Sequence, residues 1–323
     1  KVIRTIKEMC RKYRIKSYDE DTGMGFLRHV LIRSSYKTGE MLVVLVTGNV
    51  IFPAKKQFVK DLTNRYPKIA SIVMNINDKK TSMVLGDREI TLYGKGYIED
   101  ELCGRKFRIS PKSFYQVNPV QTRKLYGTAL DYAELTGEEN VFDLYCGVGT
   151  ISLFLAKKAK HVIGVEIVEQ AIEDAKVNAQ INHIENAQFY CGAAEEVIPD
   201  LYRQGVTADV VVVDPPRKGC DEKLLDTIVN MAPEKVVYVS CDSATLARDL
   251  KYLNEHGYVV RKVQPVDMFP MGVHVETVVL LSQLKQKPDD TIEIDLDLDE
   301  LNATSTELKA TYQEIKDYVL KEF

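Results

Sequence analysis

The sequence has no apolar run near the roughly 20 residues that a helix needs to cross a bilayer, which argues against a membrane-spanning chain. Residues 1–14 are charged and amphipathic and lack the apolar core of a signal peptide. The six cysteines are scattered without a CxxC pair, so we expect neither a disulfide framework nor a metal site. These absences favour a cytoplasmic protein without membrane partners.

The remaining composition is that of an ordinary globular chain, with 45% hydrophobic and 28% charged residues. A length of 323 residues predicts two domains and an appendage. The chain opens on Lys1 rather than Met, so we expect it to be a piece of a longer protein.

Charge is distributed unevenly behind the net value of −4. Residues 1–112 hold 23 Lys and Arg against 12 Asp and Glu, which is a charge of +11. Residues 113–287 hold 17 against 24, and residues 288–323 hold 3 against 11. A basic block ahead of an acidic one indicates that the first block binds a polyanion, although a solvated lysine surface would have the same composition.

The basic block has the pattern of a small α+β domain, which we place at residues 1–112. Apolar residues at helical spacing predict a helix over residues 2–13. Short apolar runs between turn residues predict four strands, at residues 27–33, 41–46, 71–75 and 89–92.

From residue 113 the pattern changes to alternating strands and helices. The predicted strands are residues 141–144, 161–166, 187–191, 210–214, 235–239, 258–266 and 275–282. The predicted helices are residues 120–135, 151–158, 168–182, 224–231 and 245–256. This alternation predicts an α/β domain over 113–285 with a doubly wound parallel sheet, whose ligands sit beyond the carboxyl ends of the strands. Residues 286–323 form an acidic extension in which we find no chemistry.

A glycine-rich turn, residues 143–150 (DLYCGVGT), joins a predicted strand to a predicted helix. Such a turn lets the backbone approach a ligand, and the helix that follows presents free N–H groups. Glu166 ends the next strand, where an acid commonly accepts hydrogen bonds from ribose hydroxyls. The third glycine of a dinucleotide fingerprint is missing and Asp143 stands inside the motif, which favours S-adenosylmethionine over NAD.

Three further motifs lie at the ends of predicted strands. Residues 214–219 (DPPRKG) form a rigid loop in which Asp214 can face a cofactor or a substrate. Cys241 lies just past another strand, ahead of a helix whose dipole would lower the pKa of the thiol. Glu276 opens the last strand, which is otherwise apolar, and a carboxylate there is costly unless it is used or paired. Cys241 and Glu276 therefore enter one crevice as a nucleophile and a base.

In order and spacing, these motifs resemble those of the RNA uracil-5-methyltransferases, the family of the tRNA T-loop enzyme and the 23S rRNA enzymes. The resemblance is carried by residues 113–118 (SFYQVN), 145–147 (YCG), 214–217 (DPPR), 240–242 (SCD) and 269–276 (FPMGVHVE). It covers residues 1–285 and is most specific over 113–280. Within the family the chain looks most like a Gram-positive-type 23S rRNA enzyme, partly because of its acidic tail.

The resemblance implies a class I Rossmann-like methyltransferase domain that follows a smaller RNA-binding domain. It implies contacts with S-adenosylmethionine, and with its product S-adenosylhomocysteine, from Gln116, Tyr145, Gly147, Glu166 and Asp214. The target uridine must leave its stack to react, and Phe114 is the aromatic residue expected to stack on it. We expect a monomer that acts on RNA.

The implied chemistry explains the pair at the strand ends. Attack of the Cys241 thiolate on C6 of uracil makes C5 nucleophilic enough to accept a methyl group. Glu276 then removes the C5 proton, and the cysteine is eliminated. The expected activity is thus methylation of C5 of a uridine in 23S rRNA.

The chain departs from the family pattern in several places. Asp242 stands where many members have Asn, and Gly272 where Thr or Ser is common. The N-terminal OB-like domain and the four cysteines that bind an iron–sulfur cluster in many rRNA members are not in this sequence, so such a cluster is expected only in a preceding part of the protein.

Three other functions stay open at this point. The chain could be a tRNA T-loop enzyme, which the catalytic motifs do not separate from an rRNA enzyme. It could methylate an amino nitrogen through Asp214-Pro215-Pro216, a reaction that gives Cys241 and Glu276 no role. It could also be an RNA-binding module with a degenerate cofactor fold.

Overall fold

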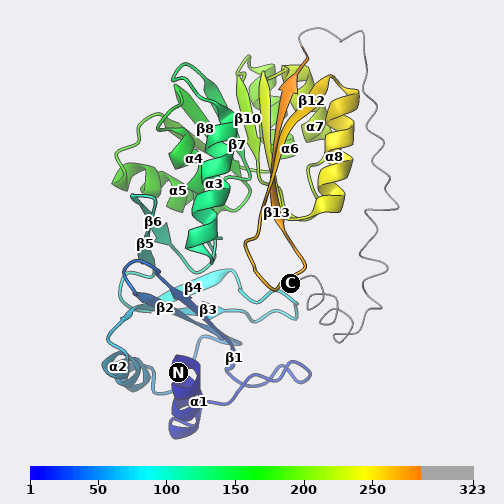
Figure 1. The fold of residues 1–323 in the computed structure, drawn as a ribbon. Helices are drawn as coiled ribbons and strands as arrows, with labels where there is room; N and C mark the ends of the chain where they lie inside the picture. Colours follow the sequence, from blue (N-terminus) through cyan, green and yellow to red (C-terminus); the bar gives the residue numbers. More distant parts are fainter. Residues whose placement is uncertain (285–323) are drawn as a thin grey trace, which may run out of the picture. The chain divides into compact units, whose positions relative to one another are not determined.

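The computed structural model describes residues 1–284, which contain a four-stranded sheet, a two-stranded hairpin and a seven-stranded sheet (Figure 1). The acidic extension predicted for residues 286–323 lies outside the described residues. By their contacts residues 1–284 form one compact unit, and the expected boundary at residue 112 stays a prediction.

The four-stranded sheet has its strands in chain order. They are β1 (Leu27–Ser34), β2 (Met41–Thr47), β3 (Ile69–Ile76) and β4 (Arg88–Tyr93). β2 is apolar throughout because both of its faces are covered. Val43 and Leu45 pack with the helices α1 (Val2–Lys12) and α2 (Lys55–Arg65). Leu42, Val44 and Val46 pack toward the hairpin that follows the sheet.

Two helices cover one face of this sheet. α1 (Val2–Lys12) confirms the helix predicted from periodicity. α2 (Lys55–Arg65) joins the parallel strands β2 and β3 and was not predicted, because only Phe58 and Leu62 are fully buried and its other positions are largely charged or polar. A parallel pair needs such a crossover.

The hairpin of β5 (Ile98–Leu102) and β6 (Arg105–Ile109) was also not predicted, since charged residues alternate with its apolar ones. Cys103 and Gly104, between the strands, have φ of 50° and 76°, as a tight two-residue turn requires.

The hairpin is tied to α5 (Glu169–Ile181) and to the residue that follows it. Asn182 exchanges two hydrogen bonds with the backbone of Lys106, at 2.9 and 2.7 Å. The backbone N–H of Arg108 donates to the Asn178 side chain at 2.7 Å, and the Asn178 amide donates in turn to the Val148 carbonyl at 2.9 Å.

The seven-stranded sheet has the order β12-β13-β11-β10-β7-β8-β9. Its strands are β7 (Asn140–Leu144), β8 (His161–Glu166), β9 (Ala187–Cys191), β10 (Val210–Val213), β11 (Lys235–Ser240), β12 (Tyr258–Val266) and β13 (Glu276–Gln283). The predicted α/β class is confirmed. The prediction of an all-parallel sheet is wrong, because β13 is antiparallel to both β11 and β12. β12 returns into β13 through a short loop without a helix, and such a connection can only join antiparallel strands.

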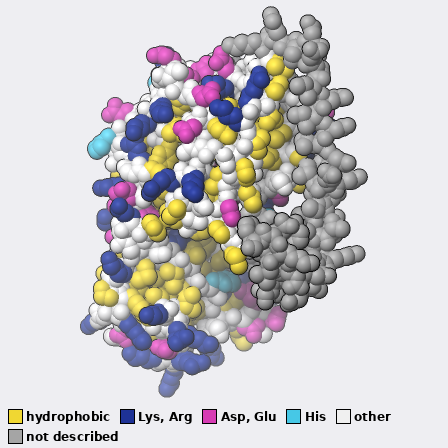
Figure 2. All heavy atoms as spheres, in the orientation of Figure 1, with side chains coloured by type: hydrophobic (Ala, Val, Ile, Leu, Met, Phe, Trp, Pro, Cys, Tyr) yellow, Lys and Arg dark blue, Asp and Glu magenta, His cyan; other side chains and the backbone are white. Residues whose placement is uncertain are grey.

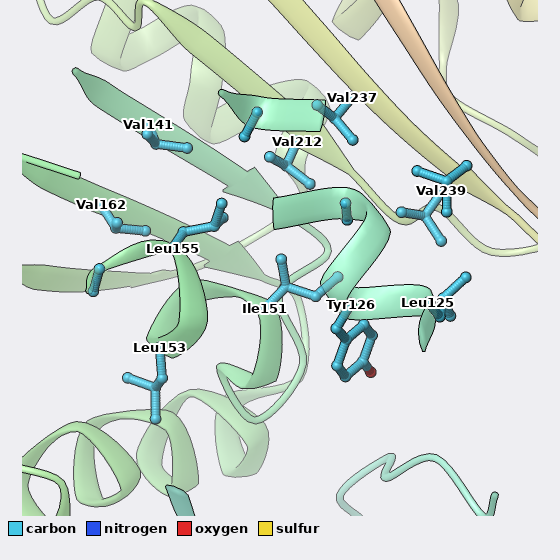
Figure 3. Packing of buried hydrophobic residues seen from close by; sticks show 14 of the residues in the cluster. Leu125, Tyr126, Val141, Ile151, Leu153, Leu155, Val162, Val212, Val237 and Val239 are labelled. Carbon is cyan, nitrogen blue, oxygen red and sulfur yellow. The ribbon is translucent and has the colours of Figure 1, made fainter. Parts of the chain in front are cut away.

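Helices cover both faces of this sheet. Those on one face are α3 (Pro119–Ala133), α4 (Thr150–Leu155) and α5, and those on the other are α6 (Ala194–Arg203), α7 (Glu222–Met231) and α8 (Ser243–Glu255). Successive strand residues alternate between the two cores. Val212 and Val237 pack under α3 and α4, as Figure 3 shows, while Val211 and Val236 pack under the other layer.

The strand order reverses between β7 and β10, since the chain runs outward to β9 before it returns to β10. At such a point the loops beyond the carboxyl ends diverge and leave a crevice. The topology therefore predicts a ligand-binding crevice between the loops that follow β7 and β10. None of the helices within residues 1–284 has the length and apolar character that crossing a membrane requires.

Candidate active site

The glycine-rich loop after β7 has a backbone that few side chains tolerate. Tyr145, Gly147 and Gly149 have φ of 66°, 56° and 77°, and Gly149 is the N-cap of α4. A Cβ added at Gly147 would meet no atom within 4 Å, so this part of the loop faces open space. The loop can therefore accept a ligand directly against its backbone.

Glu166, at the end of β8, holds this loop in place. Its two carboxylate oxygens accept hydrogen bonds from the backbone N–H groups of Gly147, at 3.1 Å, and of Val168, at 2.9 Å. The side chain is half-buried, and each oxygen keeps a second lone pair. The acid predicted at the strand end thus lies beside the predicted glycine loop.

Asp143 lies below the loop and is fully buried. One of its oxygens accepts a hydrogen bond from the Ser152 hydroxyl, and the other has no partner among the described residues. Burial raises the pKa of this carboxyl to about 7, and the nearby Glu166 carboxylate adds to the shift.

Cys241 and Glu276 come together through strand register. The last pair of this ladder is Ser240 of β11 with Thr277 of β13, and Cys241 and Glu276 are the next residues on the two strands. The charge of Glu276 accordingly acts on the Cys241 thiol. Both residues are half-buried. The antiparallel direction of β13 has a consequence here, because it brings the start of this strand to the carboxyl edge of the sheet.

Electrostatics at this pair correct one sequence expectation. Burial raises the pKa of the Cys241 thiol, and the carboxylates of Glu276 and Asp214 raise it further. The expected lowering by the dipole of α8 is therefore wrong for the free protein, because desolvation and two neighbouring acids outweigh it. Burial likewise raises the pKa of Glu276, and it raises the pKa of Asp214 to about 8.

Arg217 is the functional candidate that sequence reasoning left without a role. Its guanidinium is the cation that lowers the pKa of both Cys241 and Glu276, against the effect of burial. Its position directly after Asp214-Pro215-Pro216, at the end of a buried strand, was the signal that could have identified it.

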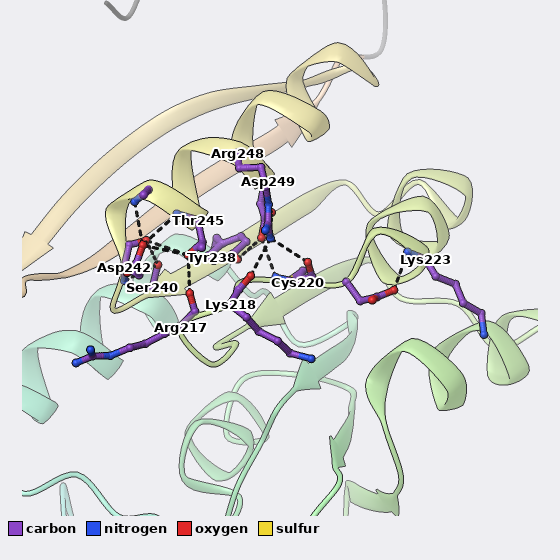
Figure 4. Close-up of polar contacts among 12 residues, drawn as sticks. Arg217, Lys218, Cys220, Lys223, Tyr238, Ser240, Asp242, Thr245, Arg248 and Asp249 are labelled. Carbon is purple, nitrogen blue, oxygen red and sulfur yellow. Dashed lines mark hydrogen bonds and ion pairs between the residues drawn. The ribbon is translucent and has the colours of Figure 1, made fainter. Parts of the chain in front are cut away.

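Helix α8 holds the Arg217 loop in place (Figure 4). The Thr245 hydroxyl donates to the Arg217 carbonyl at 3.0 Å, and the Arg248 guanidinium donates to the Lys218 carbonyl at 2.9 Å. Asp249, fully buried, accepts hydrogen bonds from the Cys220 backbone N–H at 2.8 Å and from the Tyr238 hydroxyl at 2.6 Å. The loop is therefore preorganised by one helix.

The residues beside Cys241 fix its backbone. The Asp242 side chain caps α8 by accepting from the N–H groups of Ala244 and Thr245, both at 3.1 Å. The Ser240 hydroxyl donates to the Asp242 carbonyl at 2.8 Å. Asp and Asn side chains are equally suited to capping, so the departure at this position leaves the local structure intact.

The segment 113–118 connects the hairpin to α3. The Asn118 amide donates to the Met268 carbonyl at 3.0 Å, which joins the start of α3 to the loop between β12 and β13. Phe114 is exposed, and Gln116 is half-buried with no side-chain hydrogen bond among the described residues. Gly272 lies in the same β12–β13 loop, and its N–H donates to the Phe269 carbonyl at 2.8 Å, which closes a turn.

The described residues therefore bring two groups to one edge of the sheet. One holds the glycine loop and Glu166, and the other holds Cys241, Glu276, Asp214 and Arg217. Within residues 1–284, no cluster of three or more His, Cys, Asp or Glu side chains is arranged to hold a metal ion.

Curated proteins that are similar to this chain include bacterial RNA methyltransferases. The chain is 57% identical over 279 residues to an uncharacterized RNA methyltransferase of Listeria monocytogenes, which covers 86% of this chain and 61% of that protein. It is 54% identical over 283 residues to another from Clostridium acetobutylicum, covering 88% of this chain and 62% of that protein. The chain thus spans about three fifths of the length of these curated relatives.

Among solved structures, the chain is similar to the tRNA (uracil-54, C5)-methyltransferase of Pyrococcus abyssi, which was crystallised with S-adenosyl-L-homocysteine. The TM-score is 0.71 at 32% identity, and the match covers 86% of this chain and 66% of that one. This similarity confirms the predicted Rossmann-like methyltransferase fold.

The model of one protein family, described as tRNA (uracil-5-)-methyltransferase, matches residues 35–284, a range that includes both groups at the carboxyl edge. The chain belongs to this family of S-adenosylmethionine-dependent RNA methyltransferases.

Proposed function

We propose that this chain carries the catalytic part of an enzyme that methylates C5 of a uridine in 23S rRNA, with Cys241 as the nucleophile and Glu276 as the base. The observation that carries the proposal is the register of β11 and β13, whose last pair, Ser240 with Thr277, leaves a thiol and a carboxylate as the next residues at the ligand edge of the sheet. An amino-nitrogen methyltransferase would have no use for this pair.

The glycine loop and Glu166 fit S-adenosylmethionine. Gly147 leaves the space that a ligand would occupy, and Glu166 keeps lone pairs for ribose hydroxyls beside it. We assign Gln116, Tyr145 and Asp214 to the same ligand. When bound, S-adenosylmethionine supplies an electrophilic methyl group. Asp214 suits the face that meets a cationic ligand, since such a charge would favour its ionised form.

Cys241 acts first in the proposed reaction. Its thiol proton leaves to solvent, which reaches this half-buried residue, and Arg217 stabilises the resulting thiolate. The thiolate adds to C6 of uracil, and the electron pair of the C5–C6 bond moves onto C5 and its neighbouring carbonyl. Phe114, which is exposed in the segment before α3, is assigned to stack on the flipped base.

Glu276 acts last. Once C5 carries the methyl group, the carboxylate takes the C5 proton, the C5–C6 double bond re-forms and the C6–Sγ bond breaks. Arg217 favours the ionised carboxylate that this step needs, against the effect of burial on its pKa. The thiolate that leaves is then ready for another turnover.

The test uses Glu276→Gln, which keeps the nucleophile and removes the proton acceptor. Incubated with S-adenosylmethionine and RNA, this variant should accumulate a covalent protein–RNA adduct that migrates as a shifted band on a denaturing gel. The matched control, Cys241→Ala with Glu276→Gln, should show no shifted band. Normal turnover by Cys241→Ala alone would refute the covalent mechanism and favour the amino-nitrogen reaction.

A second substrate is supported by one specific observation, the similarity to the Pyrococcus abyssi enzyme whose name gives tRNA uracil-54 as its target. The two candidate substrates can be distinguished by incubating the chain with 23S rRNA or with tRNA, each isolated from cells that lack this gene. Formation of 5-methyluridine in rRNA alone would support our proposal, and formation in tRNA alone would replace it.

A further inference from the structure

We propose that a groove between α3 and β12 holds the single-stranded RNA that flanks the target uridine. The inference rests on the proposed function, which supplies the RNA, and it assigns a binding surface to residues outside the reacting centre. The groove is lined by α3 residues, including Gln121, Arg123, Lys124 and Gly127, and by the end of β12, including Gln264.

The groove leads away from the active site. Its first wall, α3, begins directly after the segment that carries Phe114 and Gln116. Its second wall, β12, ends at Val266, which pairs with Glu276 of β13. The hydrogen bond from Asn118 to the Met268 carbonyl joins the two walls at the end nearest the site. A strand whose uridine reaches Cys241 and Glu276 can therefore continue along α3, which lies beside β13 in Figure 1.

Gly127 is a first sign that this face of α3 meets a ligand. It lies inside a 15-residue helix, where glycine is less favourable than alanine. A Cβ at this position would meet no atom within 4 Å, so packing within the described residues does not require the glycine. A backbone that approaches closely from outside would require it.

Gln121 lies on the same wall of the groove. Its side-chain oxygen is shielded from solvent, but its amide nitrogen is accessible and donates to no described residue. This nitrogen can donate a hydrogen bond to a phosphate or ribose oxygen.

The charges of the groove fit a ribose–phosphate chain. Arg123 and Lys124 are exposed on α3, and neither forms an ion pair within residues 1–284. Asp131 and Asp267 line the same groove and offer acceptors to hydroxyl groups. Figure 2 shows Lys and Arg side chains over α3, beside hydrophobic side chains over β12 and β13. Cations for phosphates and acceptors for 2′-hydroxyls suit RNA better than an acidic peptide.

The test measures the affinity of the full chain for fluorescein-labelled uridine oligomers of 3 and 20 nucleotides by fluorescence anisotropy. Arg123→Glu with Lys124→Glu should weaken binding of the 20-mer at least tenfold and leave the 3-mer nearly unchanged. It should also lower the slope of log Kd against log salt by about 1.4, at about 0.7 per lost phosphate contact. Gly127→Gln should weaken binding of the 20-mer without a change of charge.

The matched control is Lys157→Glu with Lys158→Glu. These two exposed cations follow α4, form no ion pair among the described residues and do not line the groove. The control makes the same change of charge and should alter Kd less than twofold. Unchanged circular dichroism and thermal midpoints in all variants separate loss of binding from loss of folding.

Equal losses for the groove variant and the control would overturn the inference, as would equal affinities of the wild type for the 3-mer and the 20-mer. If the chain methylates no RNA but the groove variants still lose the 20-mer, the proposed function fails and the groove stands. If the chain methylates RNA and the groove variants behave like the control, the groove alone fails.

Discussion

Removal of the Asp249 carboxylate should destabilise the chain far more than removal of a similar carboxylate at the surface. Asp249 is fully buried and accepts from the Tyr238 hydroxyl and the Cys220 N–H, which are themselves buried. Asp249→Ala strands both donors, at about 1–3 kcal/mol each. The pair with Arg248 adds less than about 1 kcal/mol, because that side chain is 57% exposed.

The expected loss for Asp249→Ala is therefore about 2–7 kcal/mol. At about 2–4 °C per kcal/mol, the thermal midpoint should fall by roughly 4–28 °C. Differential scanning fluorimetry measures this fall. For Asp249→Asn the midpoint should fall less, because the amide oxygen can replace Oδ2, the one carboxylate oxygen that accepts from both donors.

Asp226→Ala is the matched control. The Asp226 carboxylate also accepts from a tyrosine hydroxyl, that of Tyr252, but it is exposed on α7. Its removal should cost less than about 0.5 kcal/mol, since water replaces the lost partner. Equal falls in the two alanine variants would refute the reasoning that buried donors make Asp249 important.

Three further predictions concern ligands and pH. Glu166→Ala should weaken binding of S-adenosylhomocysteine at least tenfold in calorimetry, because charge-assisted hydrogen bonds contribute about 1.5–3 kcal/mol each. An unchanged Kd would show that Glu166 does not contact this ligand. If the +11 charge of residues 1–112 contacts phosphates, the affinity for RNA should fall steeply as salt rises from about 50 to about 200 mM. An affinity that does not change over this range would show that these charges do not contact phosphates. Burial raises the pKa of Asp214 from 3.8 to about 8, so between these pH values the folded chain keeps a proton that the unfolded chain loses. The free energy of unfolding should therefore fall as the pH rises from about 4 to about 8. Asp214→Asn should flatten the fall in thermal midpoint between those pH values, and an identical pH profile for the wild type and the variant would contradict the assignment.

Much of the fold could be predicted because the spacing of apolar residues in a segment indicates both its secondary structure and which of its faces are buried. The apolar run of β10 is buried on both faces, and the alternation of strands and helices marks the α/β domain. α6 was not predicted, because Pro199 interrupts its helical pattern, and α2 was not predicted because its buried face is so narrow. The antiparallel direction of β13 could have been predicted, because the short connection from β12 leaves no room for a crossover helix.

Some features of the site could likewise be predicted from local sequence patterns, and others could not. Cys241 could be placed at the carboxyl edge because it follows a predicted strand. Glu276 opens its strand and reaches the same edge only because β13 is antiparallel, which the predicted parallel sheet would not allow. The pKa of Cys241 could not be predicted, since it depends on burial and on the distances to Asp214, Glu276 and Arg217. The roles of Thr245 and Asp249 in holding the Arg217 loop are likewise tertiary, because the loop and α8 are about 30 residues apart in the chain.

The side chain of Asn178 gives the molecule a mechanical property. One amide accepts from the Arg108 backbone in the β5–β6 hairpin and donates to the Val148 carbonyl in the glycine loop. The hairpin cannot shift against α5 without breaking this bridge or dragging the glycine loop with it. If a ligand favoured one position of the hairpin, this bridge would couple that ligand to the glycine loop, and a ligand in the loop would change affinity at the hairpin by the same factor.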